Sequence, residues 1–155
     1  MDNLGKHLAH YYYKHILEIA KIAANLGKQE KVKVYIVGGV VRDIILGRKT
    51  HDIDLMVEGN GISFAKKLAN IIGVKKIVPY EKFGTALIPN KSFQIEVASS
   101  RSESYDDMSR SPSEVKDASI EDDLKRRDFT INAMAMNISE EKFGDVIDPF
   151  RGIND

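Results

Sequence analysis

The sequence predicts an α+β fold, in which a mixed sheet of about five strands has its helices packed on one side. Two observations lead to this prediction. Segments rich in β-branched residues alternate along the chain with segments whose apolar residues recur at three- and four-residue steps. Glycine-containing turns separate the segments, as at Gly38-Gly39 and Gly59-Asn60-Gly61. Strands and helices in this alternation each bury one face, so they form a layered domain around one core.

Composition supports a single domain and narrows its chemistry. The 155 residues are 43% apolar, which is enough for one core. Lys and Arg number 23 and Asp and Glu number 23, so the net charge is zero and the broad basic surface of an autonomous nucleic-acid binder is missing. Any nucleic-acid contact must then be local or lie elsewhere. The absence of cysteine excludes a disulfide framework, a thiol nucleophile and thiolate metal ligands, which favours cations bound by oxygen.

The expected location is the cytoplasm. The N-terminus has neither a basic leader nor an apolar one, and no stretch approaches about 18 consecutive apolar residues. We therefore expect no membrane partner. The sequence leaves the oligomeric state open.

Residues 1–30 are expected to form an N-terminal helical segment, followed by the main domain at 31–155. Apolar residues recur at helical spacing from His7 to Leu26, and Gly27 is expected to end this helix. The run Tyr11-Tyr12-Tyr13 could offer a stacking surface for bases. One tyrosine packed inward is the more ordinary interpretation, so we assign this helix no site.

The remaining elements follow in chain order. Strands are predicted at 32–37, 53–57, 76–78, 85–88 and 93–98. Helices are predicted at 40–46 and 62–72. Residues 99–119 lack a hydrophobic period and predict a long loop. A capping box beginning at Ser119 starts a further helix, whose basic end is Lys125-Arg126-Arg127.

Asp52 and Asp54 are candidate metal ligands. Residues two apart on a strand point to the same face about 7 Å apart, so their carboxylates can share divalent ions such as Mg²⁺. An isolated pair of this kind is also typical of the solvent face of an edge strand. Glu96, between two apolar strand residues, could join the pair from an adjacent strand or simply face solvent.

Gly38 and Gly39 are candidate phosphate-binding residues. They follow a predicted strand and precede a predicted helix, so the backbone can approach an anion at the helix N-terminus. Arg42, one turn into the helix, could add a bidentate phosphate contact. An ordinary tight turn explains the glycines equally well, and Arg42 could instead be a surface charge or pair with Asp43.

Taken together, these features resemble the active-site pattern of the DNA polymerase beta nucleotidyltransferase superfamily. Within it, the chain is similar to the head domain of bacterial-type tRNA nucleotidyltransferases and poly(A) polymerases. The resemblance runs from Val34 to Asp155 and is specific because separated motifs agree in order. The segments that carry it are Tyr35 to Gly47, Asp52-Ile53-Asp54, Arg126 to Ala135 and Asp148-Pro149-Phe150.

The resemblance implies a role for each matching residue. Asp52 and Asp54 would hold two Mg²⁺ ions, with Glu96 as a third catalytic carboxylate. In the nucleotide site, the triphosphate would contact Gly38, Gly39 and Arg42. Arg127 and Asn132 would complete this site, and Asp128 would lie near the ribose. Arg101 and Glu103 open a loop that positions the primer in the family, or are simply solvated. The four histidines, His7, His10, His15 and His51, are left out of the metal site.

The function that the resemblance implies is metal-dependent, template-independent addition of nucleotides from CTP or ATP to the 3′ end of tRNA. Whether the product is CCA, CC, A or poly(A) stays open, because the family's base-selecting residues and its tRNA-gripping neck, body and tail domains are expected beyond this chain. Two alternatives remain. One is a nucleotide-binding module without transfer activity on its own. The other is a small-molecule nucleotidyltransferase, against which the segment from Arg126 to Ala135 argues.

Overall fold

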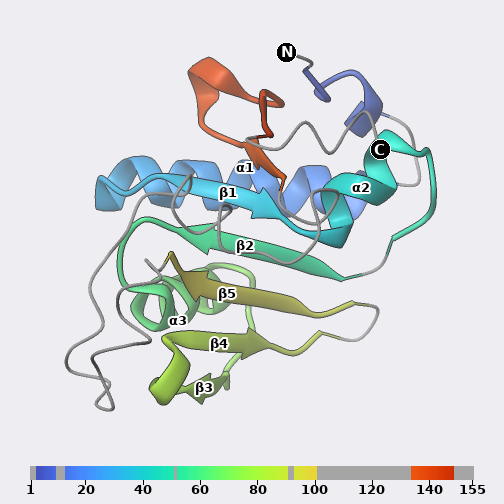
Figure 1. The fold of residues 1–155 in the computed structure, drawn as a ribbon. Helices are drawn as coiled ribbons and strands as arrows, with labels where there is room; N and C mark the ends of the chain where they lie inside the picture. Colours follow the sequence, from blue (N-terminus) through green and yellow to red (C-terminus); the bar gives the residue numbers. More distant parts are fainter. Residues whose placement is uncertain (1–2, 10–12, 51, 91–92, 101–133, 149–155) are drawn as a thin grey trace.

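A seven-stranded mixed sheet organises the computed structural model, which describes residues 3–9, 13–50, 52–90, 93–100 and 134–148 (Figure 1). The strand order is β3-β4-β5-β2-β1-β6-β7. Among the described strands β2 and β5 run parallel, and every other neighbouring pair is antiparallel. The strands span Val34–Val37 (β1), Ile53–Val57 (β2), Val78–Tyr80 (β3), Thr85–Ile88 (β4), Ile95–Ser99 (β5), Ala135–Asn137 (β6) and Val146–Ile147 (β7).

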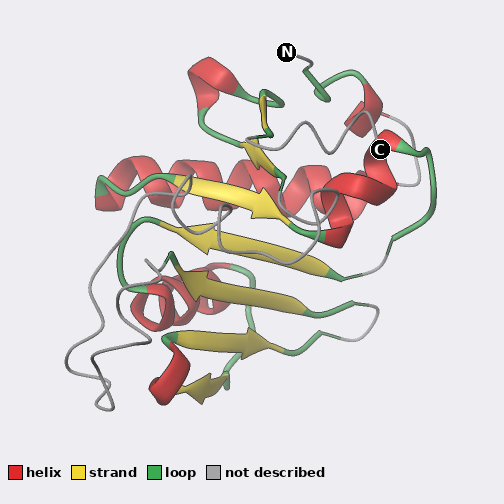
Figure 2. Ribbon diagram, in the orientation of Figure 1, coloured by secondary structure: helices red, strands yellow, loops and turns green. Residues whose placement is uncertain are grey.

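The longer helices lie on one face of this sheet. Figure 2 shows α1 and α3 behind the strands, with α2 at the end where β1 finishes. The helices span Lys14–Glu30 (α1), Gly39–Ile45 (α2) and Gly61–Ile71 (α3), and the short 3₁₀ helices span His7–Ala9 (η1), Glu81–Phe83 (η3) and Glu140–Lys142 (η6). The α+β class, the mixed sheet and the one-sided helices are therefore confirmed.

The main core lies between the helices and the face of the sheet that they cover. Ile36, Leu55 and Ile95 point into it from three neighbouring strands, and Ile16 and Leu68 enter from α1 and α3. All five side chains are fully buried, and burying each contributes about 1.5–3 kcal/mol. We call the other face of the sheet the open face, because α1, α2 and α3 pack on the opposite one. It carries a smaller apolar cluster, itself buried, next to the polar residues described below.

The N-terminal helix differs from its prediction. A 3₁₀ turn at His7–Ala9 precedes α1, which runs through Gly27 and ends only at Glu30. Gly27 is buried, and a Cβ there would meet a Val34 side-chain carbon at 2.8 Å. Its role is thus close packing of α1 on β1. The left-handed cap falls instead on Lys31, with φ 57°. Division of the chain at residue 30 stays a prediction, although α1 shares the core of the sheet.

The expected number of strands was too low by two. β1 to β5 occupy the expected regions within a few residues, but β6 and β7 were not predicted. They have three and two residues, which is too short for a strand-like alternation to show in the sequence. The predicted helix that starts at Ser119 and nearly all of the predicted 99–119 loop lie outside the described residues.

The N-terminal segment docks on the turn between β6 and β7. The Leu4 N–H donates to the Gly144 carbonyl at 2.7 Å, and the Asn3 side-chain amide donates to the Phe143 carbonyl and to Asp145 Oδ1, each at 2.7 Å. Gly144 has φ 89°, and a Cβ there would lie 2.5 Å from the Gly5 nitrogen. Glycine is therefore required at this contact.

A membrane-spanning helix is not found among the described residues, since none of their helices is both long and apolar enough.

The start of α3 is locked to the end of β5, which fixes the helix on the sheet. The Gly61 N–H donates to the buried Ser99 hydroxyl at 2.8 Å, and that hydroxyl donates to the Gly84 carbonyl at 3.3 Å. Asn60 caps the helix by accepting from the Ser63 N–H at 2.9 Å. A Cβ on Gly61 would lie 2.7–2.8 Å from three backbone atoms of residues 84, 98 and 99, so no side chain fits.

We expect Gly61→Ala to destabilise the fold by about 1–3 kcal/mol, because backbone atoms cannot move aside as a flexible side chain can. Urea unfolding followed by circular dichroism measures the change. Lys66→Ala, at an exposed position of the same helix, is the control and should stay within about 0.5 kcal/mol of the unchanged protein. Equal stability of the two variants would show that α3 is not held by this contact.

Candidate active site

Asp54 and Glu96 lie directly opposite each other on the parallel strands β2 and β5. Neighbouring strands are about 4.8 Å apart, so the two carboxylates come from adjacent backbone positions. Both residues belong to the open face, because their strand neighbours, among them Leu55 and Val97, are buried on the helix side. Asp54 is partly buried and Glu96 is exposed. The sheet thus brings together two of the three predicted carboxylates.

Asp52 immediately precedes β2 and is exposed. Its Oδ1 accepts a hydrogen bond from the Gln94 N–H at 3.2 Å, and the Gln94 carbonyl accepts from the Ile53 N–H at 2.9 Å. These bonds tie the entry of β2 to the entry of β5. Within the described ranges, however, no group of three or more His, Asp or Glu side chains is placed to hold a metal ion. The arrangement is therefore a pair of facing carboxylates, Asp54 and Glu96, with the Asp52 carboxylate close by and hydrogen-bonded to the backbone.

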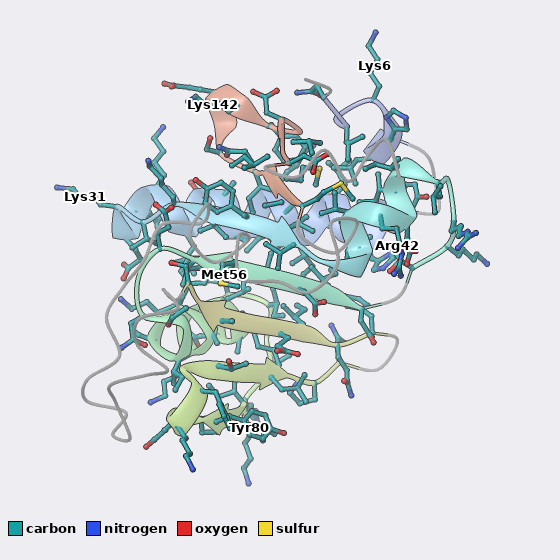
Figure 3. All side chains as sticks on the ribbon, in the orientation of Figure 1. Lys6, Lys31, Arg42, Met56, Tyr80 and Lys142 are labelled. Atoms are coloured by element: carbon teal, nitrogen blue, oxygen red, sulfur yellow. The ribbon has the colours of Figure 1, made fainter. Side chains whose placement is uncertain are left out.

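A small pocket of about 110 Å³ lies beside the facing carboxylates. Its lining combines the two acids with the apolar residues Val37, Leu55, Met56 and Ala98. Met56 belongs to the apolar cluster of the open face and is labelled in Figure 3. Apolar walls next to a carboxylate pair reduce the local water and strengthen its interaction with a cation.

The Gly38-Gly39 turn lies at the same end of the sheet as the carboxylates. It follows β1, which is antiparallel to β2, so the end of β1 is beside the start of β2. Gly38 has φ 76°, which favours glycine, and its N–H donates to the Met134 carbonyl at 3.3 Å. The strand-turn-helix prediction is confirmed, with α2 starting at Gly39.

Arg42 folds back toward the glycine turn. A Cβ added to Gly39 would lie 3.0 Å from a terminal guanidinium nitrogen of Arg42. Arg42 Nε also pairs with Asp43 Oδ1 at 3.2 Å, so the pairing that we considered as an alternative role does occur. The Arg42 side chain keeps 35% of its surface exposed, and Figure 3 shows it near the start of β2. A guanidinium thus stands at the turn, within reach of solvent.

Tyr13 anchors the C-terminal end of α2 through its hydroxyl group. Its hydroxyl donates to the Arg48 carbonyl at 2.8 Å and lies 3.3 Å from the Asp43 carbonyl, while the residue is only 2% exposed. The ordinary interpretation, one tyrosine packed inward, is confirmed for Tyr13. Nothing in the sequence pointed to these hydrogen-bond partners, because they lie 30 and 35 positions away from Tyr13.

Several of the residues weighed for the site, including some that were left out of it, lie outside the described residues. They are the nucleotide-site residues Arg127, Asp128 and Asn132, the loop residues Arg101 and Glu103, and two of the histidines, His10 and His51. His7 is on η1. His15 is on α1, where its ring lies 4.9 Å from that of Phe93.

The chain belongs to the poly A polymerase head domain family. The sequence profile of this family matches residues 34–155, which include the whole sheet, the glycine turn and all three carboxylates.

Particular relatives and solved structures agree with this assignment. The A-adding tRNA nucleotidyltransferase of Aquifex aeolicus (strain VF5) is 47% identical over 124 residues, 80% of this chain and 15% of that protein. A tRNA nucleotidyltransferase solved with a primer tRNA and an incoming ATP analog has 43% identity and a TM-score of 0.74 over 86% of this chain and 36% of that one. A CCA-adding enzyme solved with ATP has 36% identity and a TM-score of 0.82 over 99% of this chain and 34% of that one. This chain thus spans about a third or less of each.

Proposed function

We propose that this chain is the catalytic head of a nucleotidyltransferase that adds nucleotides from CTP or ATP to the 3′ end of tRNA without a template. The observation that carries the proposal is the pairing of Asp54 with Glu96 on the open face, beside the Gly38-Gly39 turn, in a member of this family. Support comes from relatives that are A-adding or CCA-adding enzymes and from their solved complexes with ATP, CTP and a primer tRNA.

The carboxylates suit divalent metal ions. Asp54 and Glu96 offer hard oxygen donors from adjacent strands, and Asp52 adds a third from the entry of β2. Oxygen ligands of this kind are preferred by Mg²⁺. We propose that Asp52 and Asp54, with Glu96, hold two such ions. When bound, the ions would lower the pKa of the attacking hydroxyl and neutralise charge on the phosphates.

The glycine turn is the proposed triphosphate site. Gly38 and Gly39 let backbone approach the phosphates at the start of α2, and Arg42 brings a planar donor group to the same turn. The Arg42–Asp43 pair holds the guanidinium at this position. On the family resemblance, Arg127 and Asn132 complete the nucleotide site and Asp128 lies near the ribose.

The proposed reaction is an in-line nucleotidyl transfer. The RNA 3′-hydroxyl oxygen attacks the α-phosphorus in line and gives up its proton to solvent, a new P–O bond forms, the bond between the α-phosphorus and the α,β-bridging oxygen breaks, and pyrophosphate leaves. Reactions of this kind need positioning and charge stabilisation more than covalent catalysis by the protein. Phosphates held at the glycine turn and a primer end held at the carboxylates would supply the alignment.

The nucleotides that are added and the cellular location are also part of the proposal. Addition of CCA, CC, A or poly(A) differs in the number and identity of nucleotides added, which sequencing of the extended tRNA reads directly. The cytoplasmic location stays a prediction. The small-molecule nucleotidyltransferase is the weaker alternative, because the relatives named above act on tRNA.

The transfer itself is tested by replacing the aspartates. Asp52→Asn and Asp54→Asn should each lower the rate of labelled ATP or CTP incorporation into tRNA lacking its 3′ end by about 10² or more, since each removes a charge that stabilises the transition state. Glu18→Gln, at an exposed position of α1, is the control and should retain the rate. Unchanged turnover in either aspartate variant would refute its catalytic role. Absence of transfer in the unmodified chain, with ATP binding retained, would favour the nucleotide-binding module instead.

Triphosphate binding is tested with Arg42→Ala. Loss of a charged donor to phosphate should weaken ATP affinity about tenfold, equivalent to ~1.4 kcal/mol, and leave AMP affinity nearly unchanged, because AMP lacks the outer phosphates. Titration calorimetry in Mg²⁺ measures both ligands. Lys21→Ala on α1 removes one positive charge away from the turn and serves as the control. Similar losses for ATP and AMP would place Arg42 away from the β- and γ-phosphates.

A further inference from the structure

The open face continues from the carboxylates to the outer strand β3. Glu96 faces Leu87 on β4, and Leu87 faces Val78 on β3. Two residues further along β5, Ala98 faces Thr85 on β4, and Thr85 faces Tyr80 on β3. Cross-strand partners point to the same face of a sheet. Val78 and Tyr80 therefore share the face of Glu96, with Val78 two strand spacings or ~10 Å away and Tyr80 two residues further along, ~12 Å away.

This outer edge carries an unusual set of exposed apolar side chains. Val78, Tyr80 and Phe83 are 42%, 48% and 56% exposed, and they are three of the five large hydrophobic residues exposed in the described part of the chain. Figure 3 shows Tyr80 at the bottom edge of the sheet. Exposed apolar residues scattered singly are normal, but a group beside a candidate site indicates a binding surface.

The same region is basic in a chain whose net charge is zero. Around β3, residues 74–88 contain three lysines and a single acidic residue, Glu81. Lys76 and Lys82 are exposed on either side of β3. Lys66 and Lys75 line a cleft of about 670 Å³ between α3 and the loop that leads to β3. The balanced total charge thus conceals a local positive region.

Exposed aromatic rings among lysines are suited to single-stranded nucleic acid, since bases stack on the rings and phosphates attract the ammonium groups. A protein partner that adds a strand to β3 fits less well, because Pro79 removes an N–H donor from this edge. We propose that Val78, Tyr80 and Phe83, with Lys76 and Lys82, form a docking surface for the single-stranded 3′ segment of the RNA substrate. We call this set the β3 edge surface.

The proposal rests on the proposed function, because it places the RNA 3′ end at the carboxylates. From there, ~12 Å of open face leads to Tyr80, a distance that about three to four stacked nucleotides cover at ~3.4 Å each. A base upstream of the 3′ end would stack on Tyr80. Lys76 and Lys82 would contact the backbone on either side of it.

Fluorescence anisotropy with a short labelled single-stranded oligoribonucleotide tests the β3 edge surface. Tyr80→Ala should weaken binding at least fivefold, whereas Tyr80→Phe, which keeps the ring, should bind as the unchanged protein does. Lys76→Gln with Lys82→Gln should also weaken binding and lower the slope of log affinity against log salt by about 1.4, for two phosphate contacts on a single strand. The control pair Lys14→Gln with Lys21→Gln, on α1 behind the sheet, should leave the slope unchanged.

The outcomes separate this proposal from the proposed function. ATP affinity should be unchanged in all these variants, since none touches the glycine turn. RNA affinity that is unaffected by Tyr80→Ala, reduced equally by the α1 control pair, or absent in the unchanged protein would overturn the β3 edge surface, whatever the transfer assay shows. A concentration-dependent dimer that Tyr80→Ala disperses, with RNA affinity intact, would assign the surface to a second copy of the chain instead.

Discussion

Parallel, in-register pairing of β2 with β5 is the constraint on which the rest of the structure depends. It places Asp54 opposite Glu96, and a slip of one residue would turn Glu96 toward the helices and Val97 toward solvent. The chain makes this pairing possible by passing through α3 and the β3-β4 hairpin before it returns as β5. The close contact of Gly61 with the end of β5 fixes where that return ends.

One face of the sheet carries the apolar core that stabilises the fold, and the other face carries the candidate site. The helix side holds the continuous apolar core, so the open face can carry charge without weakening that core. On the open face, the glycine turn and the carboxylates gather at one end because β1 ends where β2 and β5 begin. The proposed RNA surface lies along the same face at β3. On these proposals, nucleotide, metal and primer would each have their own place on one rigid sheet, which would keep the geometry of the site.

Much of the fold could be predicted from the sequence because its elements have clear periods and glycine turns. Asp52, Asp54 and the Gly38-Gly39 turn were visible for the same reason, since each depends on local spacing. That Glu96 could join the aspartates from an adjacent strand was one of two open interpretations, because the register between residues 42 positions apart is set by packing of the whole sheet. The end of α1 was misplaced because tertiary packing of Gly27 against Val34 outweighs the usual preference of glycine for a helix end.

Metal binding by the facing carboxylates tests the central claim most directly. Mn²⁺, which carboxylates bind as readily as Mg²⁺, can be followed by electron paramagnetic resonance in the presence of ATP. The account predicts that Asp54→Asn and Glu96→Gln each weaken Mn²⁺ binding by about tenfold or more, the loss of ~1.4 kcal/mol, while Glu18→Gln does not. Unchanged Mn²⁺ affinity in Glu96→Gln would contradict it, because β5 would then supply a strand but no ligand.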